Sequence, residues 1–115
     1  MSGSERPVYL RLRDLIAEAI LDGRIRDGDP LPSVRAFAAE QGANPLTVAK
    51  AYQSFQEDGF VTVRRGVGMF VVPGATERLR SSARARFLQE EWPRVAAQIR
   101  RLALDPADLL DRVTS

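Results

Sequence analysis

The chain has 115 residues, enough for one small domain and an appendage, because a second hydrophobic core would need roughly another hundred residues. It has no cysteine and no histidine, which excludes most hydrolytic and redox enzymes and predicts no catalytic residues, no metal site and no cofactor. The formal net charge is only +2, but all except one of the 17 basic residues are arginine, whose planar side chain suits phosphates and guanine edges.

The first 41 residues predict two helices joined by a turn. Apolar side chains recur at helical spacing over residues 8–22, and Gly23 fits the left-handed conformation that ends a helix. The glycine and proline in residues 27–30 predict a turn. Ser33 can then accept a hydrogen bond from an amide of the next first turn, so a second helix is expected from there to about Gln41.

A tight break separates the second helix from a third. Asn44 is a natural N-cap and Pro45 a natural first helical residue, so the third helix is expected over 45–58, ended by Gly59. Its outer face is small and, apart from Lys50, uncharged, as suits a helix that enters a groove about 12 Å wide. The opposite face is expected to pack on the first two helices through Val48, Ala51, Tyr52 and Phe55.

From Phe60 the apolar period changes from helical to alternating. Residues 60–63 and 69–72 predict a β-hairpin with a glycine-containing loop, and Pro73 and Gly74 end it. Three helices, a short turn and a hairpin follow the order of a winged helix-turn-helix. We therefore expect an α+β fold that is mainly α, with a DNA-binding domain over 8–73 and a helical dimerisation tail over 75–115.

The tail carries a narrow apolar seam at alternating steps of four and three residues, which requires a partner. Pro93 lies inside this seam, so the helix is either kinked there or restarted. Asp105 and Pro106 predict the start of a last short helix. The residues expected at a two-fold dimer interface are Leu88, Trp92, Val95, Ile99, Leu102, Leu109 and Leu110.

Three stretches resemble the GntR family of bacterial regulators, namely DPLPSVR at 29–35, NPLTVAKAY at 44–52 and RRGVGMFV at 64–71. The short tail resembles the YtrA subfamily, whose members carry two dimerisation helices in place of a large ligand-binding domain. That second likeness depends on Trp92, Leu102, Leu104, Asp105, Pro106, Leu109 and Leu110.

The resemblance implies how the chain would contact double-stranded DNA. Arg35 would read a guanine with two hydrogen bonds, while Ser33 and Thr47 would bind phosphates. Lys50 would contact a phosphate or a base, and Leu46 could cover a thymine methyl group. The wing would follow the minor groove or its phosphates. The expected contact set is Ser33, Arg35, Asn44, Pro45, Leu46, Thr47, Lys50, Arg64, Arg65 and Gly66.

The expected function is that of a dimeric repressor that occludes a promoter at a palindromic operator, in the cytoplasm and without membrane contact. This expectation follows because the sequence has neither a signal-like start nor an apolar run long enough to span a membrane. The existence of a small-molecule inducer is left open, and Trp92 could line a pocket for a small molecule instead of a dimer interface. The arginines at 78, 80, 84 and 86 are interpreted as a solvated face rather than a second DNA site. The alternative function is a winged-helix module that binds protein and not DNA.

Overall fold

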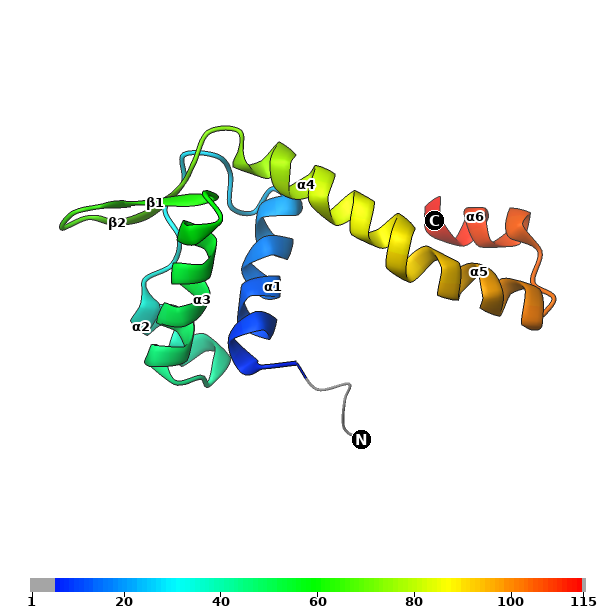
Figure 1. Ribbon diagram of the computed structural model, residues 1–115, viewed down its shortest axis with the longest axis horizontal. Coiled ribbons are helices and arrows are strands. Elements are labelled where there is room, and N and C mark those ends of the chain that lie inside the picture. The colour runs from blue at the N-terminus through cyan, green and yellow to red at the C-terminus, as the bar shows by residue number, and fades with distance from the viewer. Residues whose placement is uncertain (1–5, 115) are drawn as a thin grey trace. The chain divides into compact units, whose positions relative to one another are not determined.

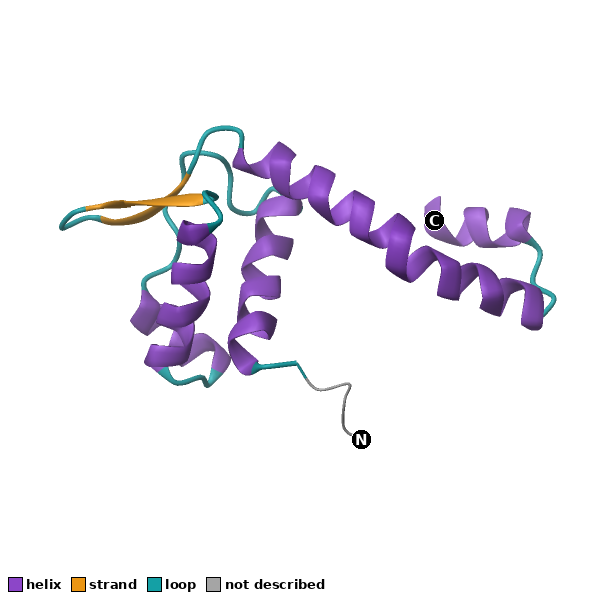
Figure 2. Ribbon diagram, in the orientation of Figure 1, coloured by secondary structure: helices purple, strands orange, loops and turns teal. Residues whose placement is uncertain are grey.

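The computed structural model describes residues 6–114, which form a mainly helical fold with one two-stranded antiparallel sheet (Figures 1 and 2). The elements in chain order are α1 (Val8–Leu21), α2 (Val34–Gln41), α3 (Pro45–Glu57), β1 (Val61–Arg64), β2 (Gly68–Val71), α4 (Ala75–Arg86), a π-helical turn (Phe87–Glu91), α5 (Trp92–Arg101) and α6 (Pro106–Thr114). The chain separates into two compact units, which we call the head and the tail, dividing between Arg80 and Ser81. The expected α+β, mainly α fold is confirmed.

The core of the head lies where α1, α2 and α3 meet the hairpin. Packing is closest between α1 and α3, which lie side by side in Figure 1. Arg13 of α1 adds a polar tie, because its guanidinium donates to the hydroxyl of Ser54 and, at 2.5 Å, to the carboxylate of Asp58. The side chains that bury the inner face of α3 are those expected from its spacing, Val48, Ala51, Tyr52 and Phe55.

The helices begin at the predicted capping residues. The hydroxyl oxygen of Ser33 accepts a hydrogen bond from the amide of Ala36 at 3.0 Å. The side-chain oxygen of Asn44 accepts one from the amide of Leu46 at 2.8 Å. Gly42, with φ of 62°, ends α2 in the left-handed conformation that disfavours any larger residue, so α3 starts only three residues later.

The hairpin pairs Val61 with Val71 at one end and Arg64 with Gly68 at the other, so both strands lie one residue nearer the loop than the expected ranges. A third segment lies beside it. The amide of Leu31 donates to the carbonyl of Met69 at 2.8 Å, and that of Val71 donates to the carbonyl of Asp29 at 2.9 Å. The stretch that leads into α2, predicted as a turn only, is therefore also hydrogen-bonded to β2.

The first two turns of α4 belong to the head. Ala75 is 1% exposed and Leu79 is 8% exposed, and both belong to the core formed by α1, α3 and the hairpin. The expected boundary at residues 73–75 followed the return of helical periodicity. That periodicity marks where a helix begins, but it does not show what the helix packs against.

In the tail, a π-helical turn at Phe87–Glu91 directly precedes the α5 residues Trp92 and Pro93. Proline lacks an amide hydrogen, and its ring clashes with the carbonyl four residues earlier in a regular α-helix. A π-helical turn uses wider spacing between donor and acceptor, so it accommodates the proline while the chain stays helical. The expected cap of α6 is present, because Asp105 accepts from the amide of Ala107 at 3.0 Å.

Candidate DNA-binding surface

The outer face of α3 is exposed as its sequence predicted. Leu46 is 79% exposed, and Ala49 and Lys50 are also exposed, whereas Thr47 is half-buried. No donor is left unpaired at the start of this helix, because Pro45 has no amide hydrogen and Asn44 accepts from the amides that follow. Its side-chain oxygen accepts from Leu46, and its carbonyl accepts from Thr47 and Val48. Phosphate binding at this end would therefore depend on side chains such as Thr47 more than on free amides.

The start of α2 differs from that of α3. Ser33 uses its oxygen to accept from Ala36 and keeps its hydroxyl hydrogen available for a phosphate. The amides of Val34 and Arg35 donate to no group within residues 6–114. Arg35 is exposed, and its side chain has no hydrogen bond or ion pair within the same range. A helix N-terminus with free amides favours anions, so this end of α2 has the groups that a phosphate contact beside Arg35 would require.

Two predicted DNA contacts already lie over aromatic rings of the head. The ammonium of Lys50 lies 4.3 Å from the centroid of the Tyr9 ring on α1. The guanidinium of Arg64 lies 4.1 Å from the centroid of the Phe70 ring across the hairpin. Arg65 at the hairpin tip has no such contact. The neighbouring Gly66 adopts φ of 76°, which allows the tight turn that exposes this tip.

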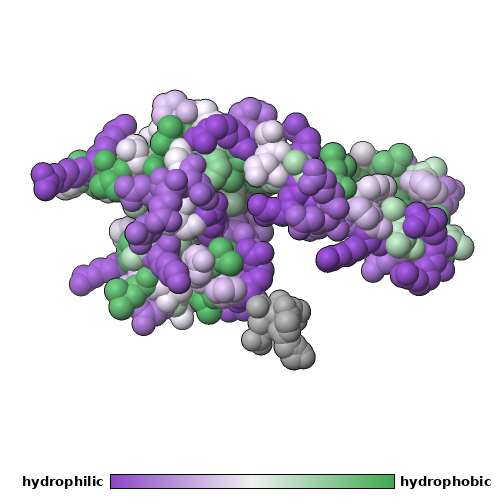
Figure 3. Space-filling view, in the orientation of Figure 1, coloured by the Kyte–Doolittle hydropathy of each residue, from purple (hydrophilic) through white to green (hydrophobic). Residues whose placement is uncertain are grey.

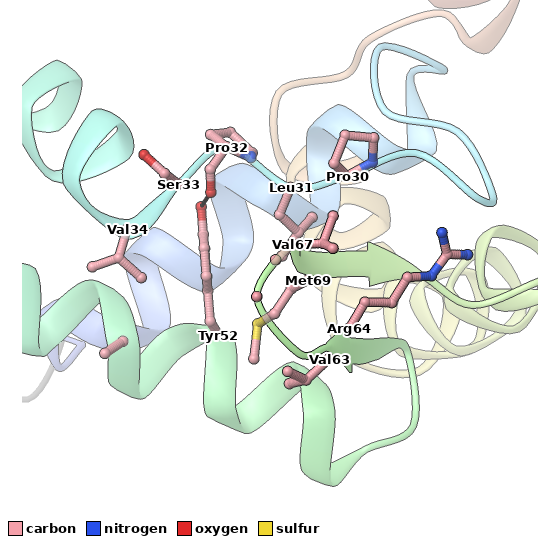
Figure 4. Close-up of a pocket in the computed structure, with 13 residues that line it drawn as sticks. Pro30, Leu31, Pro32, Ser33, Val34, Tyr52, Val63, Arg64, Val67 and Met69 are labelled. Carbon is pink, nitrogen blue, oxygen red and sulfur yellow. Dashed lines mark hydrogen bonds between the residues drawn. The ribbon is translucent and has the colours of Figure 1, made fainter.

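A groove of about 630 Å³ separates the start of α2 and α3 from the hairpin (Figure 4). It is lined by the stretch from Pro30 to Val34, by Ala49 and by the inner side of the wing, and the guanidinium of Arg64 points away from it. The groove opens between two elements that are expected to contact the two grooves of a duplex.

Tyr52 connects α3 to the segment that leads into α2. The sequence predicted only that this side chain packs in the core. Its hydroxyl donates to the carbonyl of Pro32 at 2.9 Å, just before the cap of α2 (dashed line in Figure 4). Burial raises the pKa of Tyr52 to about 12, with a smaller contribution from the charge of Glu40, so the hydroxyl stays protonated and donating at neutral pH. The sequence could have indicated this hydrogen bond, because the hydroxyl of a buried tyrosine requires a hydrogen-bond partner.

The tail exposes the predicted apolar seam. No residue of α5 or α6 is buried, and a groove of about 530 Å³ runs between these two helices. Hydrophobic side chains are visible on the tail surface in Figure 3. Of the predicted interface residues, all except Leu88 line this groove, namely Trp92, Val95, Ile99, Leu102, Leu109 and Leu110.

The seam is also wider than the sequence indicated. Leu104 and Val113 contribute to the groove as well. Phe87 lies beside Trp92, with 6.4 Å between the ring centroids, because the π-helical turn brings residues five positions apart together. Seam spacing based on a regular helix could not identify this pair.

Two further features bear on the class of protein. Within residues 6–114 no group of acidic side chains is arranged to hold a metal ion. No helix in the same range combines the length and the apolar character that are needed to cross a membrane.

Comparisons with known proteins agree with this geometry. The family model described as bacterial regulatory proteins of the gntR family matches residues 8–71. The HTH-type transcriptional repressor YtrA of Bacillus subtilis is 29% identical over 102 residues, covering 89% of this chain and 72% of YtrA. A transcriptional regulator from Oenococcus oeni has a solved structure with 30% identity and a TM-score of 0.73, covering 99% of this chain and 93% of its own.

The DNA-binding domain of AraR, solved in complex with operator ORX1, is 24% identical with a TM-score of 0.59. It covers 63% of this chain and 87% of its own, and this likeness shows the fold alone. The family match runs from the start of α1 to the end of β2, over the three helices and the wing. The 102 residues matched to YtrA exceed the length of the head and so include part of the tail. The chain belongs to the GntR family of bacterial regulatory proteins, which are not enzymes, and is one of its YtrA-type members.

Proposed function

We propose that this DNA-binding transcriptional regulator acts as a homodimer that represses transcription by covering a promoter at a palindromic operator. In each copy α3 lies in the major groove, and Arg35 reads a guanine from the start of α2. The hairpin tip at Arg65 and Gly66 follows the neighbouring minor groove. The protein works in the cytoplasm, where bacterial DNA is found.

One observation carries the proposal. Ser33 and Val34 at the start of α2 and Ala49 on the outer face of α3 line one groove together with the wing, and the exposed, unpartnered Arg35 directly follows Val34. A recognition helix must present small side chains to enter the major groove, and phosphate contacts must surround it to fix its register. Leu46 and Ala49 meet the first condition, and Ser33 meets the second.

The tail supports the homodimer. Exposed apolar patches of this kind mark interaction sites, and a second copy offers an equivalent patch related by two-fold symmetry. A two-fold dimer presents two heads to a palindrome whose half-sites lie about one helical turn, roughly 34–36 Å, or a multiple of it, apart.

The test begins with selection of bound duplexes from random DNA by the full chain. Arg35→Ala is then compared with Arg24→Ala, which removes the same charge from an exposed arginine whose carboxylate partner, Asp22, lies at 3.2 Å. We expect Arg35→Ala to weaken binding of the selected duplex by about 10- to 100-fold and to relax the preference at one base pair, since a bidentate guanine contact is lost. Arg24→Ala should change affinity less than threefold, by the small screened effect of one surface charge.

Fluorescence anisotropy at fixed salt measures both variants, and light scattering checks that each keeps the oligomeric state of the wild type. Equal affinities for Arg35→Ala and Arg24→Ala would remove Arg35 from the reading surface. Failure of the wild-type chain to retard any duplex in dilute salt would overturn the proposed function itself.

A further inference from the structure

The first turn of α4 is capped by a residue from a distant part of the head. The residue before this helix is Gly74, which has no side chain to accept a hydrogen bond. Asp27, in the connection between α1 and α2, takes this role. One oxygen of its carboxylate accepts from the amide of Gly74 at 2.8 Å. The other accepts from the amide and the hydroxyl of Thr76 at 3.1 and 2.5 Å. We call Asp27 and these three donors the Asp27 latch.

Further contacts hold the same turns of α4 on the head. Arg78 donates to the carbonyl of Gly59 at 2.6 Å, and its guanidinium lies 5.0 Å from the centroid of the Phe60 ring. Arg80 donates to the carbonyl of Leu21 at 3.3 Å, at the end of α1. The start of α4 is thus bound to the α1–α2 connection, to the end of α1 and to the turn before β1.

We propose that Asp27 is a specificity-determining residue that restricts the spacing between operator half-sites which the dimer accepts. The inference rests on the proposed function, in which the tail joins two copies. α4 is helical from Ala75 to Arg86, so it begins in the head and continues past the division at Arg80 into the tail. A contact that holds the first turn of α4 on the head also holds the direction in which this helix leaves the head. In the proposed dimer, that direction would limit the spacings at which two joined heads can reach a duplex.

Asp27 suits this role better than the apolar contacts do. Hydrogen bonds to an ionised acceptor are stronger and more directional than neutral ones, and a carboxylate at a helix N-terminus is favoured by the helix dipole. Its hydrogen bonds to Thr76 and Gly74 hold the pKa of Asp27 below its ordinary value of 3.8, so the acceptor is ionised at neutral pH. Asp27 does not line the groove beside α3, and it is not one of the predicted DNA-contact residues.

The experiment uses the full chain and the duplex obtained by selection. A set of duplexes carries the two half-sites with the spacer lengthened or shortened one base pair at a time, and one further duplex carries a single half-site. Binding is measured for the wild type, Asp27→Asn and Thr76→Val. The control is Asp22→Asn, which removes the same charge from an exposed carboxylate at the end of α1 that contacts only Arg24.

For the wild type we expect one preferred spacing, with about tenfold weaker binding one base pair away, because another spacing strains the contacts, the latch among them, that hold the start of α4 on the head. Asp27→Asn keeps only one acceptor oxygen, and Thr76→Val loses one donor without changing charge. Both should reduce the difference between spacings to less than about threefold. Affinity for the single half-site should equal that of Asp22→Asn, since no predicted DNA-contact residue is replaced.

A wild-type spacing profile in Asp27→Asn and in Thr76→Val would overturn the proposal while leaving the proposed function intact. The same holds if the wild type has no preferred spacing, or if the latch variants lose single half-site affinity to the same degree as they lose affinity for the palindrome. Absence of binding by the wild type would instead refute the proposed function. If Asp27→Asn does not fold, as checked by circular dichroism, Thr76→Val alone decides the outcome.

Discussion

The cationic side chains near the predicted DNA surface fall into two groups. Lys50 and Arg64 lie over aromatic rings, where the attraction contributes about 0.5–1 kcal/mol at an exposed site and has to be given up if the charge moves to a phosphate. Arg35 and Arg65 have no partner within residues 6–114. We therefore expect Arg35 and Arg65 to contribute more to DNA affinity than their stacked neighbours.

The wing offers a direct comparison of the two groups. Arg65→Ala should weaken binding to all duplexes about equally and lower the slope of log affinity against log salt by about one, because one phosphate contact is lost. Arg64→Ala should change that slope by less than half as much. Anisotropy titrations at four salt concentrations measure both slopes, and equal slopes for the two variants would show that stacking on Phe70 does not withdraw Arg64 from DNA.

Sequence periodicity could predict which side chains of the site are exposed, but not which cationic side chains already contact another residue. Leu46 and Ala49 were assigned to the outer face of α3 by their offset from Val48 and Phe55, and this holds. The partner of Lys50 lies on α1, and no local pattern relates the two residues. The same applies to the hydrogen bond from Tyr52 to Pro32, which depends on how α3 packs beside the start of α2.

At the scale of elements, local chemistry predicted the helix starts well, because each cap acts within three residues. Ser33, Asn44 and Asp105 all accept the expected amides. Local chemistry could not predict features that depend on residues far apart in the sequence. These are the pairing of residues 29–31 with β2 and the burial of Leu79 in the core of the head. The end of α5 was also unmarked, because the sequence offers no glycine there.

That helix end provides a prediction. Ala103 adopts φ of 54°, and the amide of Leu104 donates to the carbonyl of Ile99 at 3.0 Å, as in a helix end that normally uses glycine. Ala103→Gly should stabilise the protein by about 0.5–1 kcal/mol, because the left-handed strain removed exceeds the added freedom of the unfolded chain. Ala85→Gly, at an exposed position inside α4, should destabilise by about the same amount.

Urea unfolding of both variants at one protein concentration measures this difference. Opposite signs are the expected result. A destabilising effect of Ala103→Gly would mean that the left-handed conformation of Ala103 carries no strain that glycine relieves.

At the scale of the whole molecule, the head and the tail have different requirements. The head buries its own core, as Ile16, Val48 and Phe55 show with exposures of 2% or less. The tail buries none of the residues of α5 or α6, so its apolar side chains need a covering partner. We expect the tail to depend on self-association for its stability, and the head to be much less dependent on it.

Replacing Ile99 by aspartate should therefore give monomers, since it puts an unpaired charge into the groove of the tail, where burial of a charge is costly. Gln89→Asp adds the same charge at an exposed position outside the groove and should leave the dimer intact. Multi-angle light scattering measures the molar mass of both variants. A dimeric Ile99→Asp would place the contact between copies elsewhere in the chain.

The hydrogen bonds between residues 29–31 and β2 have a consequence for how operators are discriminated. The strand that ends the wing is hydrogen-bonded to the segment that leads into α2. If the hairpin contacts the minor groove as proposed, we expect a shift of the hairpin to move the backbone next to Arg35 as well. The energies of contacts in the two grooves would then be coupled rather than additive. Base changes under the wing would alter the penalty for a mismatch under α2, so a scoring matrix with independent positions would misjudge the affinity of operators that differ in both places.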